Sequence, residues 1–277
     1  MSGRHHRSST APTADELRSA GLAFSAEGPI AEIVLCKPER RNTQTPAMWR
    51  ALAALGRSMP DEVRVVVLRA EGPSFSAGLD RSMLDDAVDV ETVRGLLGST
   101  DFAAARTIGE YQQGFTFLRD PNFISIAAVQ GHAVGAGFQL ALACDIRVVA
   151  DNAVFCMKES ALGLVPDLTG LSPLVRQVGY ARALEICVRA RNIDAQEAVT
   201  LGLAHSAVPV GDLATEVDVL VRSVLQSDTE AVRETKRLLQ SAQDLDLEQQ
   251  RALESAAQVR RLRALAGGQT DSDQPRF

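Results

Sequence analysis

Residues 124–150 read ISIAAVQGHAVGAGFQLALACDIRVVA. The apolar, β-branched run Ile124–Val129 is typical of a buried strand, and the glycine-rich turn Gly131–Gly137 follows it directly. The apolar segment Phe138–Ala143 is helical in composition, and Ile146–Val149 has the pattern of a second strand. A strand, a glycine turn, a helix and another strand in succession predict an α/β fold.

The alternation of strands and helices continues on both sides of this stretch. Upstream we expect a hairpin, a helix with Pro46 at a favourable first-turn position, and a strand: Gly21–Phe24 with Ile30–Leu35, Pro46–Met59 and Val63–Leu68. Helical composition extends from Asp89 to Leu118. Downstream we expect a short strand at Ala153–Met157 and then only helices: Gly170–Val178, Ala181–Ala190, Asp194–Leu201, Asp212–Gln226, Thr229–Ala242 and Leu247–Ala266.

The strand patterns end near residue 205, and this shift in composition predicts the division of the chain. We expect a disordered N-terminal tail at 1–20, an α/β core at 21–205 and a helical C-terminal region at 206–277. The first residues, MSGRHHRSSTAPTADELRSAG, contain no apolar run, so a secretory signal is not expected. A transit peptide is the alternative to a tail, because acids occur there only at Asp15 and Glu16.

Composition indicates a soluble globular protein but not its chemistry. Of 277 residues, 45% are hydrophobic, 23% charged and 4% aromatic, which excludes a disordered or collagen-like chain. The net charge of 29 − 35 = −6 disfavours binding to nucleic acid, although a local basic patch could serve one anionic small molecule. The four cysteines have no C-x-x-C spacing and the histidines no zinc-like spacing, which indicates free thiols in the cytoplasm and no metal site.

Several common catalytic motifs are absent. Residues 72–76, GPSFS, do not satisfy G-x-S-x-G, and no P-loop pattern occurs. Gly131, Gly135 and Gly137 do not match G-x-G-x-x-G. Hydrolysis through a serine elbow, nucleotide hydrolysis and hydride transfer therefore lack their usual sequence support.

Two loops between a strand and a helix remain as candidates for chemistry. They are FSAGLD at 75–80 and GHAVGAG at 131–137. Glycine allows the backbone to approach a ligand closely, and the amides at the start of a helix have no partners within it. Two such loops side by side could each donate one N–H to a developing oxyanion. The alternative is that the glycines only let helices pack closely.

Several stretches in order resemble the crotonase (enoyl-CoA hydratase/isomerase) superfamily. They are SFSAGLD, AAVQGHAVGAGFQLALACDIRVVA, ESALGLVPDLTG, LVRQVGYARALEI and AVTLGLAHSAV, and the resemblance covers roughly residues 21 to 266. It implies a crotonase-like spiral of ββα units that binds an acyl-CoA, with a helical C-terminal region that assembles trimers or dimers of trimers. No cofactor is implied beyond the CoA of the substrate.

The resemblance also assigns the binding groups. The backbone amides of Leu79 and Ala136 correspond to the oxyanion-hole donors around the thioester oxygen. Residues implied to line the substrate or CoA are Ala77, Asp80, Arg81, Gly135 and Gln139, with Asp80 and Arg81 near the adenine end. Ala136 stands where the family usually has a glycine, so its methyl group narrows the pocket. The acyl pocket is implied to come from residues 85–118.

The acid–base positions favour isomerisation over hydration. Hydratases of the family use two glutamates 20 residues apart, and here these positions hold Gln139 and Glu159. Glutamine cannot exchange a proton at neutral pH. Asp167, eight residues after Glu159, matches an acid that dienoyl-CoA isomerases of this family use, whereas Δ3,Δ2-enoyl-CoA isomerases rely on the one acid at the Glu159 position. Dehalogenases of the family have an aspartate there too, but with tryptophan at the Glu159 position.

Each of these three residues also has a purely structural interpretation. Glu159 could be a surface acid at a strand end, Asp167 the N-cap of the following helix, and Gln139 a buried hydrogen-bonded side chain. We therefore predict an enoyl-CoA isomerase in which Glu159, with Asp167, carries the proton. The alternatives are a weak or specialised hydratase, in which Asp167 or Gln139 positions water, and a crotonase-like protein that binds acyl-CoA without catalysis.

Overall fold

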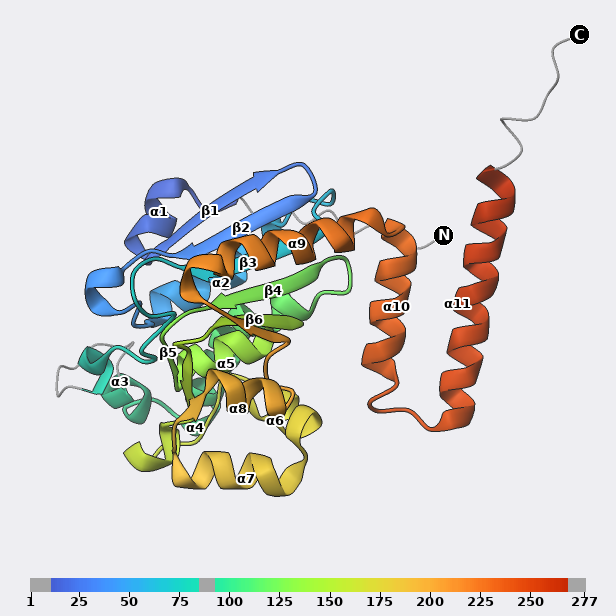
Figure 1. The fold of residues 1–277 in the computed structure, drawn as a ribbon. Helices are drawn as coiled ribbons and strands as arrows, with labels where there is room; N and C mark the ends of the chain where they lie inside the picture. Colours follow the sequence, from blue (N-terminus) through green and yellow to red (C-terminus); the bar gives the residue numbers. More distant parts are fainter. Residues whose placement is uncertain (1–10, 85–92, 269–277) are drawn as a thin grey trace, which may run out of the picture.

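The centre of the molecule is a six-stranded sheet, seen in a computed structural model that describes residues 11–84 and 93–268 (Figure 1). β1 and β2 form an antiparallel hairpin, and the other neighbouring strands run parallel. The order across the sheet is β1 (Leu22–Glu27), β2 (Ile30–Leu35), β3 (Val65–Ala70), β4 (Ile124–Val129), β6 (Ile146–Ala150) and β9 (Ser206–Val208).

The central strands β3, β4 and β6 of this sheet are buried on both faces. Val66 and Leu68 of β3 point into the main core, whereas Val65 and Val67 point to the opposite face, as the two-residue period of a strand requires. α9 (Leu213–Gln226) covers that second face with Leu213, Val217 and Val221. Continuous β-branched runs are the expected sequence of a parallel sheet covered on both sides.

The helices α2 (Pro46–Ser58) and α4 (Asp101–Thr116) pack against each other at the main core. The Trp49 ring lies 5.0 Å from that of Tyr111 and 6.3 Å from that of Phe115. The short helix α3 (Val93–Leu97) precedes α4. The predicted helical stretch 89–118 therefore consists, from residue 93 on, of the two helices α3 and α4. Its first residues, 89–92, lie outside the described part of the chain.

A second, three-stranded sheet carries the glycine turn. It consists of β5 (His132–Val134), β7 (Val154–Cys156) and β8 (Ile193–Asp194), in that order. α5 (Ala136–Ala143) follows β5 immediately, and all of its residues are buried. The helices α6 (Leu171–Val178), α7 (Tyr180–Arg189) and α8 (Ala195–Thr200) lie at the end of the molecule opposite to β1 (Figure 1).

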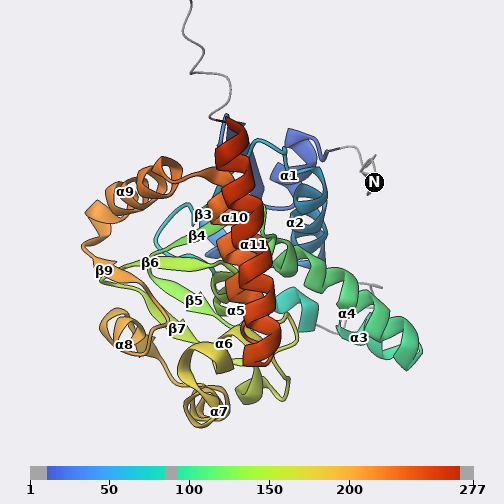
Figure 2. The same cartoon turned by 90° about the vertical axis from the view of Figure 1, so that its right-hand side faces the viewer.

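The last two helices, α10 (Thr229–Ser241) and α11 (Leu247–Gly268), form a hairpin beside the core (Figures 1 and 2). Lys236 of α10 is buried, and its Nζ donates to the carbonyls of Asp120 and Phe123 and to the Asp145 carboxylate. No helix within residues 11–84 and 93–268 is long and apolar enough to span a membrane.

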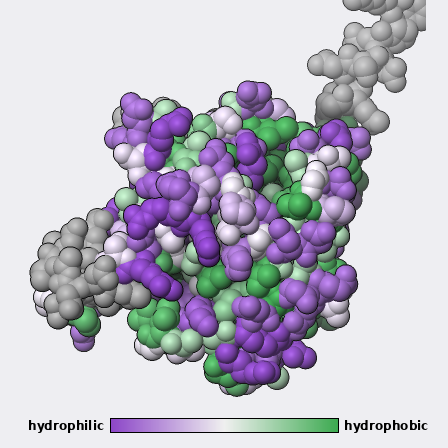
Figure 3. Space-filling view, turned by 60° about the vertical axis from the view of Figure 1, so that its left-hand side comes forward, coloured by the Kyte–Doolittle hydropathy of each residue, from purple (hydrophilic) through white to green (hydrophobic). Residues whose placement is uncertain are grey.

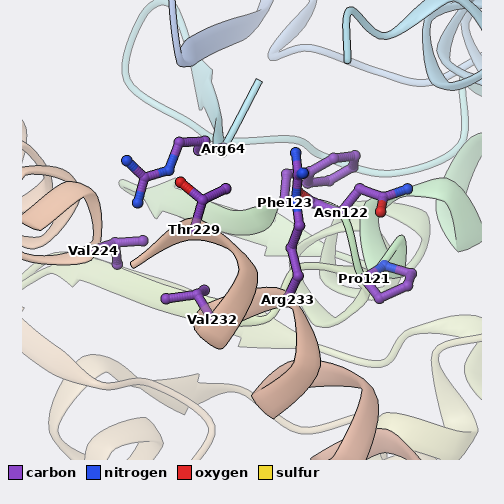
Figure 4. A pocket seen from close by; sticks show the side chains of 8 residues that line it. All are labelled: Arg64, Pro121, Asn122, Phe123, Val224, Thr229, Val232 and Arg233. Carbon is purple, nitrogen blue, oxygen red and sulfur yellow. The ribbon is translucent and has the colours of Figure 1, made fainter. Parts of the chain in front are cut away.

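Two arginines connect the junction of α9 and α10 by hydrogen bonds to the segments that precede strands β3 and β4. Arg64 donates to the carbonyls of Leu225 and Ser227, and Arg233 to those of Asn122 and Asp61. A small pocket between them is lined by Arg64, Pro121, Asn122, Phe123, Val224, Thr229, Val232 and Arg233 (Figure 4).

The prediction of a disordered tail at 1–20 is wrong for its second half. Residues 1–10 lie outside the described part, but α1 (Ala14–Ser19) is a helix with a capping box. The Thr13 hydroxyl accepts from the Glu16 amide, and the Glu16 carboxylate accepts from the Thr13 amide. This T-x-x-E signal stands in the sequence, and the helix is held to the core by the buried side chain of Leu17.

The predicted boundary at 205 also differs from the structure, because the core sheet continues beyond it. β9 pairs with β6, and α9 covers β3, β4 and β6. The last described strand ends at Val208, close to the expected position, but β8 and β9 themselves were not predicted. β8 and β9 contain two and three residues, which is too short for an alternating pattern to indicate a strand.

Candidate active site

The two glycine-containing loops are in direct contact. The Ser76 amide donates to the His132 carbonyl at 2.9 Å, and the Val134 amide donates to the Ser76 carbonyl at 3.0 Å. Gly78 has φ of +86°, and a methyl group there would lie 2.4 Å from the Val134 oxygen. Only glycine satisfies both conditions, so Gly78 brings the first loop against the start of α5.

The predicted oxyanion-hole amides lie on either side of this contact. The position of a Gly78 Cβ would be 3.5 Å from the Ala136 nitrogen. Within the described residues, neither the Leu79 amide nor the Ala136 amide donates to a protein acceptor. Ala136 is also the first residue of α5, where an amide has no partner inside the helix. Both N–H groups are thus without an acceptor in the described part of the protein; that they share one ligand oxygen, and their catalytic role, stay predictions.

Glu159 is buried beside the second loop, so the interpretation as a surface acid is wrong. It begins the 3₁₀ turn η4 (Glu159–Leu162), and only 8% of its surface is exposed. One carboxylate oxygen, Oε1, accepts from Gln139 at 2.6 Å, while the buried Oε2 has no hydrogen-bond partner among the described residues. A Cβ on Gly135 would lie 3.3 Å from Oε1, which places the carboxyl group next to the Gly135–Ala136 peptide.

The environment of Glu159 favours its neutral form. Burial raises the pKa of the carboxyl, because a charge is costly away from water. The hydrogen bond from Gln139 acts in the opposite direction, and the negative charge of Asp167 raises the pKa further. A carboxyl group with a raised pKa can accept and release a proton nearer neutral pH, which suits acid–base chemistry.

Gln139 is completely buried and makes hydrogen bonds with both ends of its amide. Its Nε2 donates to Glu159, and its Oε1 accepts from the amides of Leu168 at 2.9 Å and Gly170 at 3.3 Å. The interpretation as a buried, hydrogen-bonded side chain is therefore confirmed. The contacts also show more: Gln139 connects Glu159 to the loop that carries Asp167.

Asp167 is not a helix cap. The N-cap of α6 is Gly170, without a side-chain hydrogen bond, and Asp167 lies in the preceding loop as an exposed residue. Its main-chain oxygen accepts from Gln112 of α4 at 2.7 Å. Neighbouring atoms remove part of the solvent around the carboxyl and raise its pKa. The structure thus leaves the Asp167 carboxylate free of a capping role and near enough to Glu159 to influence its charge.

The residues implied to bind CoA differ in what their side chains do. The Asp80 carboxylate is buried, accepts from Thr43 and Ser82 and pairs with Arg40 at 3.3 Å. Burial alone would raise the pKa of Asp80, but these hydrogen bonds and the Arg40 charge lower it. Asp80 is therefore satisfied within the protein. Arg81 is exposed, as is Arg40, which the sequence analysis did not single out. The Ala77 amide donates to the Arg41 carbonyl.

The segment implied to form the acyl pocket, 85–118, is described only from residue 93. Leu97 of α3 and Phe102 of α4 are large apolar side chains that are highly exposed. The side of the molecule on which α3 lies shows hydrophobic residues interspersed among hydrophilic ones (Figure 3).

Two buried polar residues, Gln44 beside the first loop and Ser76 within it, were not singled out by the sequence analysis. Gln44 bonds to the loop through its backbone and its side chain, and Ser76 receives that side-chain bond. Both are completely buried. No signal in the sequence pairs them, because their contact joins residues 32 positions apart.

The spiral of strands, the two facing loops and the buried carboxyl group define a crotonase-fold protein. A protein of Thermobifida fusca YX, solved in complex with acetoacetyl-CoA, is 48% identical to this chain and superimposes with a TM-score of 0.88 over 92% of this chain and 100% of its own. An enoyl-CoA hydratase from Polaromonas sp. JS666 is 32% identical, with a TM-score of 0.79 over 89% of this chain and 93% of its own.

Sequence comparison identifies the family. The sequence model of the enoyl-CoA hydratase/isomerase family matches residues 25–264, and the chain belongs to this family. The carnitinyl-CoA dehydratase of Salmonella arizonae is 32% identical over 234 residues, which are 83% of this chain and 84% of that protein. The family resemblance seen in the sequence motifs is thereby confirmed, as is the crotonase fold.

Proposed function

We propose that the protein moves the double bond of an enoyl-CoA and that Glu159 carries the proton. The observation that supports this most directly is the state of the Glu159 carboxyl group: it is buried, Oε1 accepts from Gln139, and Oε2 has no partner in the part of the chain that the structure describes. Gln139 has no proton to exchange at neutral pH, so Glu159 is the one proton carrier of that buried pair.

The reaction needs one base and one oxyanion site. The Glu159 carboxylate removes a proton from C2 of a 3-enoyl thioester, and the released electron pair moves onto the thioester oxygen. The amides of Leu79 and Ala136 stabilise the resulting enolate, and each such donor is typically worth about 3–4 kcal/mol in the transition state. Return of the proton at C4 completes the shift of the double bond, and no activated water takes part.

Asp167 has a supporting role in this proposal. Its charge raises the pKa of Glu159, which brings the base closer to neutral pH. The raised pKa of Asp167 itself is compatible with temporary acceptance of the proton. The bound acetoacetyl-CoA in the Thermobifida fusca structure supports an acyl-CoA as the ligand, and the proposed chemistry uses no group beyond the CoA thioester.

Hydration or dehydration is the second candidate, and one observation favours it. Carnitinyl-CoA dehydratase of Salmonella arizonae is 32% identical to this chain. In that case Gln139 and Asp167 would position a water molecule and Glu159 would transfer its proton. Conversion of crotonyl-CoA at a rate comparable to that of a 3-enoyl-CoA would support this candidate over isomerisation.

The test compares Glu159→Gln with Glu32→Gln. Glu32 of strand β2 forms an ion pair with Arg69 of strand β3, and its substitution serves as the matched control. With a 3-enoyl-CoA we expect Glu159→Gln to lose at least a hundredfold in kcat, a typical contribution of a general base, and Glu32→Gln to behave as the wild type. Unchanged double-bond migration in Glu159→Gln would refute the proposal. Tight acyl-CoA binding by a wild type that turns over no enoyl-CoA would instead indicate a binding protein.

The proposal includes the predicted assembly into trimers or dimers of trimers and a cytoplasmic location. α11 exposes Leu253, Val259, Leu262 and Leu265, and such a series of apolar side chains on one helix supports contact with another copy. Light scattering during size-exclusion chromatography measures the mass of the assembly. A monomer at micromolar concentration would contradict this part.

A further inference from the structure

The direction of the Leu79 N–H is set by a residue on a different segment. The Gly78 carbonyl and the Leu79 amide belong to one peptide unit, and no cis peptide bond occurs in the described residues. In a planar trans unit the C=O and N–H point in opposite directions. The Gly78 carbonyl accepts from the Gln44 amide at 2.7 Å, so the Leu79 N–H points away from Gln44.

Gln44 holds the loop at two further points. Its carbonyl accepts from the Asp80 amide at 2.9 Å, on the other side of Leu79. Its side-chain Nε2 donates to the Ser76 hydroxyl at 3.1 Å. Hydrogen bonds to the Gln44 backbone thus hold the chain on both sides of Leu79, at the Gly78 carbonyl and at the Asp80 amide.

Ser76 completes the connection from inside the loop. Its hydroxyl oxygen also accepts from the Gly78 amide at 3.2 Å, and its hydrogen is donated to the Asn42 carbonyl at 2.8 Å. Asn42, Gln44 and Ser76 are all fully buried, so water does not compete for these bonds. Satisfied buried polar networks hold one geometry, because any displacement leaves a group unpaired.

The far end of the network rests on the aromatic core. Trp49 Nε1 donates to Gln44 Oε1 at 2.8 Å, which fixes the orientation of the Gln44 amide so that its Nε2 faces Ser76. The Trp49 ring in turn packs against Tyr111 of α4 at 5.0 Å. A rigid aromatic contact therefore supports the loop through a chain of directional bonds.

We infer that Gln44 and Ser76 are positioning residues that aim the Leu79 N–H at the thioester oxygen of the substrate. The inference rests on the proposed oxyanion role of Leu79. Gln44 and Ser76 act only through the peptide that they orient. Their loss should therefore weaken the recognition of a thioester carbonyl and leave binding of the CoA portion unchanged.

The experiment compares Ser76→Ala with Ser125→Ala. Ser125 is also a fully buried serine whose hydroxyl donates to a backbone carbonyl, that of Leu118, but it lies in the network of Asp145 and Lys236. For each protein we would measure thermal stability, the Kd of CoA and of acetoacetyl-CoA, the ultraviolet band of bound acetoacetyl-CoA enolate, and kcat and KM with a 3-enoyl-CoA.

For Ser76→Ala we expect the preference for acetoacetyl-CoA over CoA, and kcat, to fall about 10- to 100-fold, as a small misplacement of a catalytic group does. The enolate band should weaken and the Kd of CoA should stay unchanged. Ser125→Ala should lose stability to a similar extent and keep the preference. Trp49→Phe removes the Nε1 donor and keeps a smaller aromatic ring in the core, and it should shift the preference in the same direction. It supplies the test if Ser76→Ala does not fold.

If Ser76→Ala folds and keeps the wild-type preference for acetoacetyl-CoA over CoA, the inference is overturned. If Ser76→Ala does not fold, the same result in Trp49→Phe overturns it. A wild type that binds CoA and acetoacetyl-CoA equally would also overturn it. Failure of the proposed isomerisation is a separate result, because it appears as absence of turnover in the wild type while the binding preference is still measurable.

Discussion

Replacing Gln139 by glutamate tests the central contact of the site. The wild-type amide donates from Nε2 to Glu159 and accepts from Leu168 and Gly170. Gln139→Glu keeps the shape of the side chain but turns the donor into an oxygen. Two carboxyl groups would then face each other at the distance where a hydrogen bond now lies.

The magnitude follows from this distance. At 2.6 Å, two unit negative charges repel by about 6 kcal/mol at an effective dielectric constant of about 20. Since about 1.4 kcal/mol corresponds to a tenfold change in a protonation equilibrium, the pair must retain one proton at neutral pH. The amides of Leu168 and Gly170 stabilise a negative charge on the introduced carboxylate, so the retained proton resides on Glu159.

The assay is the pH dependence of kcat for isomerisation of a 3-enoyl-CoA. In the wild type the rate should rise as Glu159 loses its proton. In Gln139→Glu this limb should move to higher pH, and kcat at pH 7 should fall by about a hundredfold, because the base form has become scarce. Gln112→Glu is the matched control: it adds the same charge near the same loop, but Gln112 contacts the Asp167 carbonyl and not Glu159.

Equal pH profiles for the wild type and Gln139→Glu would refute the reasoning, since they would show that the Glu159 carboxyl does not sense position 139. The same shift in Gln112→Glu and Gln139→Glu would attribute the effect to general charge and not to the direct contact. Efficient hydration of crotonyl-CoA by the wild type would instead show that a glutamine at 139 does not prevent water addition.

Three further predictions concern stability. Gly78→Ala should cost about 2–3 kcal/mol in urea unfolding, because φ is +86° and the new methyl group would lie 2.4 Å from the Val134 oxygen; an unaltered midpoint would contradict this. The stability of Glu159→Gln relative to the wild type should rise as pH increases above about 4.5, the ordinary pKa of a glutamate. Burial raises the pKa of the folded Glu159 carboxyl, so the unfolded chain releases this proton first and wild-type stability falls with pH until the folded carboxyl is also ionised. A pH-independent difference in Tm would disprove it. Lys236→Met should cost about 3–5 kcal/mol by leaving Asp145 without its buried partner, and adding Asp145→Asn should recover part of the loss.

Local patterns in the chain were sufficient for most elements of the fold. Ile124–Val129 was predicted with its observed bounds, because a run of apolar and β-branched residues between turn signals is a local property. The glycines of both loops and the 20-residue spacing from Gln139 to Glu159 were also visible in the sequence. α1 was missed although its capping box is local, because the surrounding polar composition dominated the interpretation.

Short strands and buried polar contacts needed the tertiary structure. β9 has three residues and is a strand only because β6 offers it a parallel edge. Whether Asp167 caps a helix depends on where α6 begins, and the Gly170 N-cap excludes that role.

The motifs in the sequence therefore carried a resemblance to the crotonase superfamily, which implied an acyl-CoA site with Glu159 and Asp167 as the acids that carry the proton. Which atom of Glu159 is held and which is left without a partner was decided only by the fold, as was the support of Leu79 by Gln44. The physical reason is that a hydrogen bond requires a donor–acceptor distance correct to within a few tenths of an ångström and a nearly linear direction. That precision arises only when segments remote in the chain are packed together, as Gln44 and Ser76 are.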